Sequence, residues 1–243
     1  MLVYRKAIEY CLLKNKKTKI INKNRSFCDY CGIQLKWYEN IPVISWVIQS
    51  GKARCCQKKL PMLYPIVEIL MGILFVVFYR SQISDIRFQV LELIFGLIII
   101  VFLVFSAVFD LKYMILPDFS TIVLVSSALF LWCARYFGNL NYVWSAILSF
   151  GFMGFLYLIT KKKGMGFGDV KLAFFMGLFL GYPKIIVAFY FAFVIGALIS
   201  LVLLLLKKAK KKTPIPFGPF LILGTLVAWW QGDNISKFLI SNF

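Results

Sequence analysis

The stretch LELIFGLIIIVFLVFSAVFD, residues 91–110, decides the fold, because it is apolar over nearly its whole length and ends in a carboxylate. A helix of about 20 apolar residues crosses the ~30 Å hydrocarbon core of a bilayer. Similar runs recur on both sides of it, separated by short polar connections. We therefore expect an all-α polytopic membrane protein with about seven transmembrane helices. The expected spans lie at about 62–79, 88–109, 119–137, 142–160, 170–182, 184–206 and 215–231.

Composition supports this class of protein. The chain is 61% hydrophobic, yet it carries 28 Lys and Arg against 10 Asp and Glu. A membrane protein with basic loops explains both numbers, whereas a nucleic-acid binder explains only the charge, so we expect no nucleic-acid partner. Histidine is absent, which excludes Ser/His and Cys/His nucleophile arrangements. The chemistry must therefore use carboxylates, thiols or lysines.

The chain divides into two predicted domains. Residues 1–61 are polar and basic with several turn signals, and we expect a small cytosolic domain there. Residues 62–243 form the predicted transmembrane domain. Its fifth span, 170–182, is too short to cross the hydrocarbon as an upright helix, so we expect it to be shallow, tilted or continued by the loop before it.

The orientation follows from the positive-inside rule. Placing residues 1–61 in the cytosol puts most lysines and arginines on that side, including the runs Lys161–Lys163 and Lys207–Lys212. We expect these two runs to anchor the topology on anionic lipid. The opposite side receives only Arg80, Arg87, Arg135, Lys184 and Lys237.

Two carboxylates in unusual settings are the candidate catalytic residues, and both fall at the cytoplasmic boundary. Asp110 closes the apolar run, and Asp169 follows Gly164, Gly166 and Gly168 in GMGFGDVKL. Glycines allow close backbone approach, so this loop can bring Asp169 against another helix. Two carboxylates that meet out of water would share a proton, and one would then act as general base while the other acts as acid.

An alternative interpretation remains open for each aspartate taken alone. Asp110 can pair with Lys112 and Asp169 with Lys171, or either can cap a helix. The glycine pattern itself is weak evidence, because it lacks both the strand-then-helix setting of a dinucleotide site and the ending of a phosphate-binding loop.

Several longer motifs occur in order along the chain. They are CDYC at 28–31, WYENIPVISW at 37–46, GKARCC at 51–56, LYPIVE at 63–68, FDLKYMILPD at 109–118, GMGFGDVKL at 164–172 and PIPFGPFL at 214–221. Taken together, they resemble the type IV prepilin peptidases, a family of GxGD aspartyl proteases that act as leader peptidases and N-methyltransferases.

The resemblance implies an intramembrane aspartic endopeptidase in which Asp110 and Asp169 are the catalytic pair, with Asp118 as the near competitor. Such enzymes lie in the bacterial inner membrane with the N-terminal domain in the cytoplasm. They cut the basic leader of type IV prepilins or pseudopilins after Gly on the cytoplasmic side. Many then methylate the new N-terminus with S-adenosylmethionine, and Gly51 matches a glycine tied to that methylation.

The cysteines depart from the family pattern. Cys28 and Cys31 resemble one half of a zinc knuckle, but the second half would use positions 53 and 56, and position 53 is Ala53. Cys56 matches, and Cys55 is the candidate fourth ligand. Two outcomes stay open: the four thiolates bind Zn²⁺ in a closed structural site, or two or three of these cysteines are inert reduced thiols.

Two further points follow from the resemblance. The family usually begins with a hydrophobic span, and this chain starts at MLVYRK, so we expect that first helix to be missing from the sequence. Two other functions stay open: a peptidase without methyltransferase activity, and an ion-coupled membrane transporter that uses Glu68 or Glu92.

Overall fold

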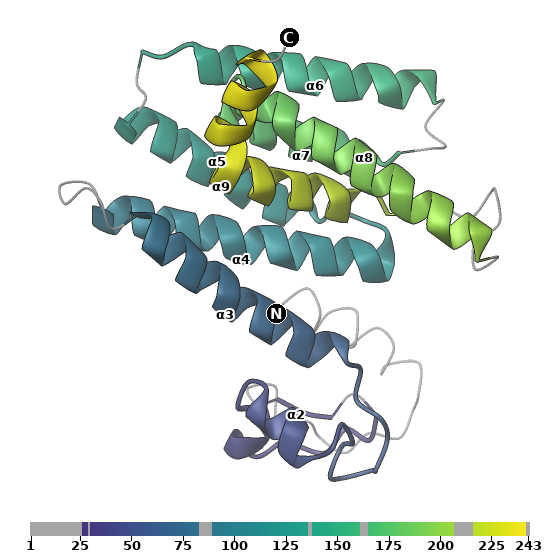
Figure 1. The fold of residues 1–243 in the computed structure, drawn as a ribbon. Coiled ribbons are helices and arrows are strands. Elements are labelled where there is room, and N and C mark those ends of the chain that lie inside the picture. Colours follow the sequence, from purple (N-terminus) through teal and green to yellow (C-terminus); the bar gives the residue numbers. More distant parts are fainter. Residues whose placement is uncertain are drawn as a thin grey trace. The chain divides into compact units, whose positions relative to one another are not determined.

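The computed structural model describes residues 26–28, 30–82, 89–135, 138–160, 165–206 and 216–241. Some expected features lie outside the described residues, namely Gly164 and the runs Lys161–Lys163 and Lys207–Lys212. The elements in chain order are η1 (Trp37–Asn40), α2 (Ile44–Ile48), α3 (Leu63–Gln82), α4 (Gln89–Tyr113), α5 (Asp118–Arg135), α6 (Asn141–Ile159), α7 (Phe167–Leu180), α8 (Lys184–Leu205) and α9 (Gly218–Ser241) (Figure 1).

The predicted all-α class is confirmed, since each of the expected spans is a helix. Pairing between extended segments in the described residues is limited to the isolated bridges Phe27–Gln34 and Lys52–Lys59. The chain forms two compact units, Met1–Ile73 and Leu74–Phe243. The domain boundary expected between residues 61 and 62 stays a prediction.

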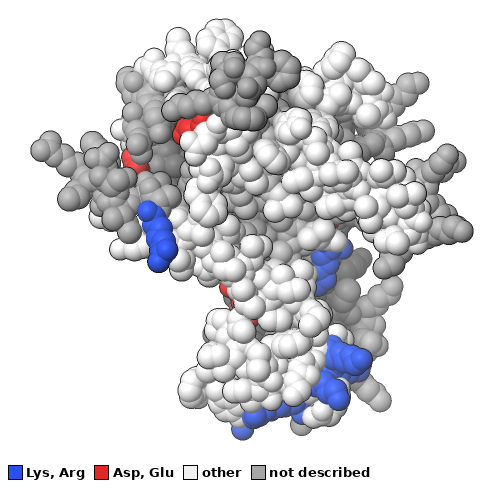
Figure 2. Space-filling view, in the orientation of Figure 1, with Lys and Arg blue, Asp and Glu red and all other residues white. Residues whose placement is uncertain are grey.

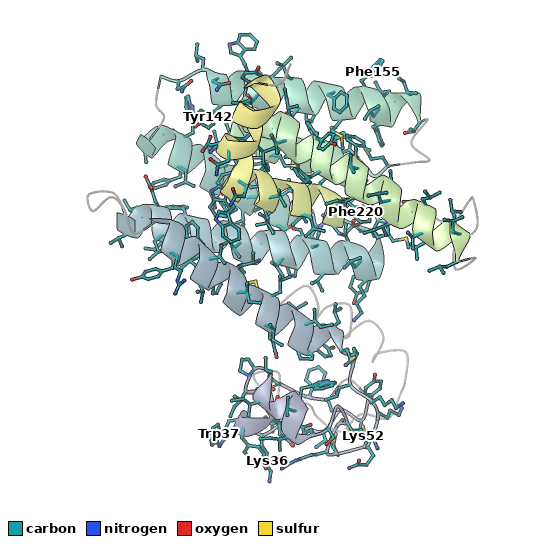
Figure 3. The ribbon with its side chains drawn as sticks, viewed as in Figure 1. Lys36, Trp37, Lys52, Tyr142, Phe155 and Phe220 are labelled. Atoms are coloured by element: carbon teal, nitrogen blue, oxygen red, sulfur yellow. The ribbon has the colours of Figure 1, made fainter. Side chains whose placement is uncertain are left out.

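The N-terminal unit is small and has little core. Neither η1 nor α2 contains a buried residue, whereas Cys28 and Ala53 are buried in the loops. Lys36 and Trp37 project away from this unit (Figure 3). On the face drawn in Figure 2, Lys and Arg gather over the unit that contains α2, while much of the described helical surface is uncharged.

The helical unit presents apolar side chains outward, as a protein surrounded by lipid does. Leu148 and Phe155 of α6 and Leu205 of α8 are all exposed, and Phe155 points away from its helix in Figure 3. Exposing so much apolar surface to water would be unfavourable, and soluble proteins rarely do so. The helices that are long and apolar enough to cross a membrane are found at Leu63–Arg80, Val90–Tyr113, Asn141–Ile159 and Lys184–Leu205. The protein is therefore a multi-pass membrane protein.

Helix α7 lies inside the helical unit and is the shortest of its helices. It contacts α5, α6, α8 and α9, and Ala173, Phe175 and Met176 are fully buried. Its 14 residues span only about 21 Å at ~1.5 Å per residue. Because other helices surround α7, its ends need not reach both edges of the hydrocarbon. The helix begins at Phe167, within the loop expected to extend it.

Glycines let the neighbours of this central region pack closely. A Cβ on Gly177 of α7 would lie 2.4 Å from the backbone oxygen of Ser145 in α6. A Cβ on Gly224 of α9 would lie 2.2 Å from the backbone oxygen of Ala188 in α8. Small residues at such crossings are the usual means by which membrane helices approach each other.

We predict that Gly177→Ala destabilises the bundle. The added methyl group meets backbone that cannot rotate away, and overpacking of this kind costs about 1–3 kcal/mol. Thermal unfolding in detergent should shift to a lower temperature by several degrees. Gly151→Ala on α6 is the matched control, because a Cβ there meets nothing within 4 Å. Equal unfolding temperatures for the two variants would contradict the close contact between α6 and α7.

Candidate active site and cysteine cluster

Asp110 lies in the last turn of α4 and is withdrawn from solvent, with only 5% of its surface exposed. Its Oδ2 accepts a hydrogen bond of 3.1 Å from the backbone N–H of Gly218. Gly218 is the first residue of α9, so this N–H is one of those that a helix leaves without an internal partner. The helix N-terminus therefore supplies both a donor and a favourable dipole for the carboxylate.

Asp169 is held in a similar way at the start of α7. It is also 5% exposed, and its Oδ2 accepts a hydrogen bond of 3.1 Å from the backbone N–H of Gly166. The Asp169 N–H donates in turn to the Gly166 carbonyl at 3.1 Å. The side chain is thus folded back on the loop before α7. Each aspartate receives one glycine N–H on Oδ2.

Leu116, in the connection from α4 to α5, lies between the glycines next to the two aspartates. A Cβ on Gly168 would lie 2.7 Å from the Cβ of Leu116, and a Cβ on Gly218 would lie 3.5 Å from its Cδ1. This connection therefore packs against the first turns of both α7 and α9. Gly218 holds Asp110 and Gly168 precedes Asp169, so the structure brings the two predicted carboxylates to the same end of the helical unit, near Leu116.

Asp118, the near competitor, has a different environment. Its Oδ1 lies 2.6 Å from the Nζ of Lys171, and its side chain is 72% exposed. The pairing with lysine that remained open for each boundary aspartate thus occurs at Asp118. An exposed ion pair of this kind contributes little, about 0–1 kcal/mol in water. Asp118 is anchored to α7, whereas Asp110 and Asp169 are buried against backbone donors.

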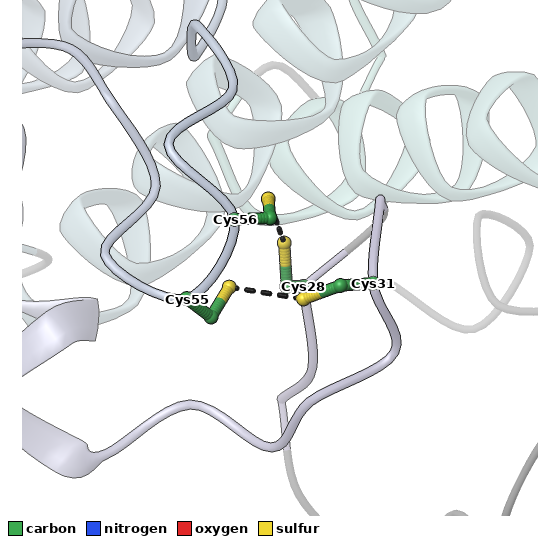
Figure 4. Close-up of side chains that lie close together, drawn as sticks. All are labelled: Cys28, Cys31, Cys55 and Cys56. Atoms are coloured by element: carbon green, nitrogen blue, oxygen red, sulfur yellow. Dashed lines mark hydrogen bonds between the residues drawn. The ribbon is translucent and has the colours of Figure 1, made fainter.

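The four predicted metal-ligating cysteines lie together in the N-terminal unit (Figure 4). The Sγ atoms of Cys28, Cys31, Cys55 and Cys56 are all within 4.8 Å of one another. The Sγ distance from Cys28 to Cys56 is 3.9 Å, close to the ~3.8 Å edge of a tetrahedron with Zn–S bonds of ~2.3 Å. The 3.0 Å between Cys31 and Cys55 is much longer than a disulfide bond of ~2.05 Å. This donor set fits a zinc ion.

The two loops that carry these cysteines share one backbone pattern. Cys28 N–H donates to Ile33 and its carbonyl accepts from Gly32, at 2.8 and 2.9 Å. Ala53 N–H donates to Lys58 and its carbonyl accepts from Gln57, at 2.9 and 2.8 Å. Gly32 and Gln57 both have positive φ, 71° and 57°. Ala53 therefore occupies in the second loop the place of Cys28 in the first.

In the same comparison of the two loops, Cys56 occupies the place of Cys31, and Cys55 occupies the place of Tyr30. The second loop thus has no thiol at position 53 and carries one at position 55. Adjacent cysteines do not reproduce the sequence spacing of a knuckle, yet both side chains reach the cluster. Contact with Cys55 lowers the pKa of Cys31, and the same contact raises the pKa of Cys55. Metal binding requires these thiols as thiolates.

Gly51 and Trp46 pack against each other in the N-terminal unit. Gly51 has φ +67°, and a Cβ there would lie 2.8 Å from the Trp46 ring. This positive φ and the tight packing explain why glycine is needed. The Trp46 Nε1 atom is buried and has no hydrogen-bond partner in the part of the chain that the structure describes. A buried N–H without an acceptor is unusual.

The side chain of Glu68, on α3, is hydrogen-bonded to the turn before α2. Its Oε2 accepts a hydrogen bond of 2.7 Å from the N–H of Val43, a residue held at φ 60°. The carboxylate thereby stabilises a strained turn inside the N-terminal unit, which is a structural role.

Gly218 and Leu116 were missed as functional candidates by the sequence reasoning. Both lie in quoted motifs, FDLKYMILPD and PIPFGPFL, but no role was assigned to either residue. The available signal was a glycine followed by Pro219 at the start of an apolar helix, a pattern typical of a helix N-terminus.

The sequence matches two described protein families. Residues 2–82 match "Bacterial Peptidase A24 N-terminal domain", and residues 97–201 match "Type IV leader peptidase family". The first match includes the cysteine cluster and the second includes both buried aspartates. No solved structure matches the chain.

Curated relatives agree with these matches. A protein of Bacillus subtilis (strain 168) is 33% identical over 89% of this chain and 85% of its own length. Proteins of Stutzerimonas stutzeri and Aeromonas hydrophila are each 32% identical, over 87% and 90% of this chain and 73% and 76% of their own lengths. All three are named "Prepilin leader peptidase/N-methyltransferase". With these matches spread over both units, the chain belongs to the type IV leader peptidase family.

Proposed function

We propose that this protein cleaves the basic leader of type IV prepilins or pseudopilins, after Gly, with Asp110 and Asp169 as its catalytic carboxylates. The observation that carries the proposal is the burial of both side chains at one end of the helical unit, each on a glycine N–H. The family and its named relatives support the substrate class.

The chemistry follows from two carboxylates that share one proton. The ionised carboxylate takes a proton from a water molecule, whose oxygen attacks the scissile carbonyl carbon. The protonated partner donates its proton to the carbonyl oxygen, and the tetrahedral intermediate then collapses with protonation of the leaving amine. The bonds to Gly166 and Gly218 hold Oδ2 of each aspartate, which fixes the directions in which the other oxygens face.

The proposed reaction takes place on the cytoplasmic side of the bacterial inner membrane. Asp110 lies at the end of α4, and Asp169 and Gly218 lie at the starts of α7 and α9. Alternating helix directions place these positions on one membrane side. The excess of lysine and arginine in the connections on that side supports its assignment to the cytoplasm, with the N-terminal unit there too.

We predict that Asp110→Asn and Asp169→Asn each lower the rate of prepilin cleavage by about 10²–10⁴-fold, because an amide neither accepts nor shares the required proton. Cleavage is measured with purified enzyme in detergent and a prepilin with Gly–Phe at the junction. Asp118→Asn is the matched control and should retain most activity, since Asp118 contacts Lys171 on an exposed surface. Full activity in either of the first two variants would rule out the mechanism.

We further propose that the four cysteines bind one zinc ion as a structural site. The ion would join the loop at 28–33 to the loop at 53–58 in a unit that has little apolar core. Structural zinc commonly supplies such small domains with their folding free energy. In this arrangement Cys55 provides the ligand that Ala53 does not.

The zinc proposal is tested by metal content and by moving one thiol. Purified wild-type protein should contain about one zinc per chain, and Cys55→Ser should lose it. Adding Ala53→Cys to that variant should restore the zinc, because Ala53 occupies the place of Cys28 in the matching loop. Cys133→Ser, on α5, is the control and should not change the metal content. Retained zinc in Cys55→Ser would contradict the assignment of Cys55.

We also propose that the protein methylates the new N-terminus, with Gly51 and Trp46 in the part that serves this step. S-adenosylmethionine would supply the methyl group. The buried, unsatisfied indole N–H of Trp46 beside Gly51 is a suitable donor to a carboxylate or ring nitrogen of that cofactor. The names of the relatives support the activity.

We predict that Trp46→Phe weakens cofactor binding and methylation while leaving cleavage unchanged, because the smaller ring lacks the N–H donor and reduces the packing on Gly51. Equilibrium binding of S-adenosylmethionine and mass spectrometry of the cleaved N-terminus measure the two effects. Trp37→Phe is the control, since Trp37 is 79% exposed. Wild-type product lacking the mass of a methyl group would establish a peptidase without methyltransferase activity.

A further inference from the structure

Gly218, the first residue of α9, contacts Asp110 of the candidate catalytic pair although the two are far apart in the sequence. We propose that Gly218 is a positioning residue for Asp110. Its N–H fixes one carboxylate oxygen, and its lack of a side chain leaves the space that the carboxylate occupies. This inference rests on the proposed function, because it concerns the geometry of the same site.

The first evidence is the space around Gly218. A Cβ there would lie 2.6 Å from the Oδ2 of Asp110 and 3.2 Å from its Cγ. Real Cβ atoms do not approach other atoms so closely, so any other residue would displace the carboxylate. The contact is with the functional group itself and not with surrounding backbone. A displacement of about 1 Å in a catalytic group can lower the rate about 10²-fold.

The second evidence is the backbone conformation of Gly218. It begins α9 with no positive φ, so a left-handed conformation, the commonest reason for a glycine, does not apply here. Room for the Asp110 carboxylate is therefore a requirement separate from the backbone conformation.

The third evidence is the hydrogen bonding of the first turn of α9. Pro219 has no N–H, and the N–H groups of Phe220 and Leu221 both donate to the Phe217 carbonyl, at 3.0 and 3.3 Å. The Gly218 N–H points instead to Asp110. Every backbone amide of this turn is thereby accounted for, and one is directed at the carboxylate.

The position of Leu116 extends this role to the pair. Leu116 lies close to both Gly218 and Gly168, and Gly168 immediately precedes Asp169. Displacing residue 218 would therefore disturb the contact that sets α9 against α7 as well as the Asp110 carboxylate. The start of α9 defines where one aspartate lies relative to the other.

The test compares three glycine-to-alanine variants with purified enzyme and a prepilin. Gly218→Ala should lower kcat by about 10²-fold, with KM unchanged and the unfolding temperature lowered less than in Gly224→Ala. Gly224→Ala, on the same helix, meets the Ala188 backbone at 2.2 Å and should lower the unfolding temperature with kcat of the folded enzyme unchanged. Gly151→Ala meets nothing within 4 Å and should resemble the wild type.

A double variant keeps the test decisive if Gly218→Ala also lowers stability. When Asp110→Ala has removed the carboxylate, adding Gly218→Ala should cause no further loss of stability, because the clashing group is gone. Equal destabilisation in both backgrounds, or a wild-type kcat in Gly218→Ala, would overturn the positioning role. Wild-type enzyme that fails to cleave any prepilin would instead refute the proposed function, so the two failures are distinguishable.

Discussion

Burial of two carboxylates at the end of an apolar helix bundle is the constraint on which the rest of the structure depends. A carboxylate that loses its water needs hydrogen-bond donors in return. Asp110 and Asp169 each obtain one from a glycine N–H at or just before the start of a helix. Backbone amides meet this need without adding a charge, whereas a lysine beside either aspartate would hold it ionised and prevent a shared proton. Lys171 contacts Asp118 instead.

The packing of the bundle makes the burial of these two carboxylates possible. Helix α7 is enclosed by other helices rather than lipid, so its 14 residues need not cross the hydrocarbon, and its first turn can begin where Asp169 is buried. Leu116 fills the space between α7 and α9 where Gly168 and Gly218 carry no side chain. Leu116 is complementary in size to Gly168 and Gly218, and a larger residue at position 168 would clash with Leu116.

The sequence was sufficient to predict the all-α fold and to single out the two aspartates that the structure buries, but not to predict the contacts that hold them. Apolar runs of membrane length predict the helices directly, and Asp110 and Asp169 stand out within ordered motifs. The contact of Gly218 with Asp110 joins positions more than a hundred residues apart, and no local pattern encodes it. Helix α9 also continues to Ser241, beyond the predicted end at 231, because polar residues such as Gln231 and Asp233 lower its hydropathy without ending the helix.

The cysteine loops show the same limit of prediction from sequence, because here a local pattern argues against a contact that the structure contains. Spacing along the chain disfavours Cys55 as a ligand, because adjacent cysteines do not form the usual knuckle. The backbone pattern of the loop is nevertheless kept, with Ala53 in the place of Cys28 and Gln57 in the left-handed conformation of Gly32. A loop whose shape is maintained by its own hydrogen bonds can present a thiol from a neighbouring position. Ligand geometry is therefore a property of the folded loop, and sequence spacing is only its usual sign.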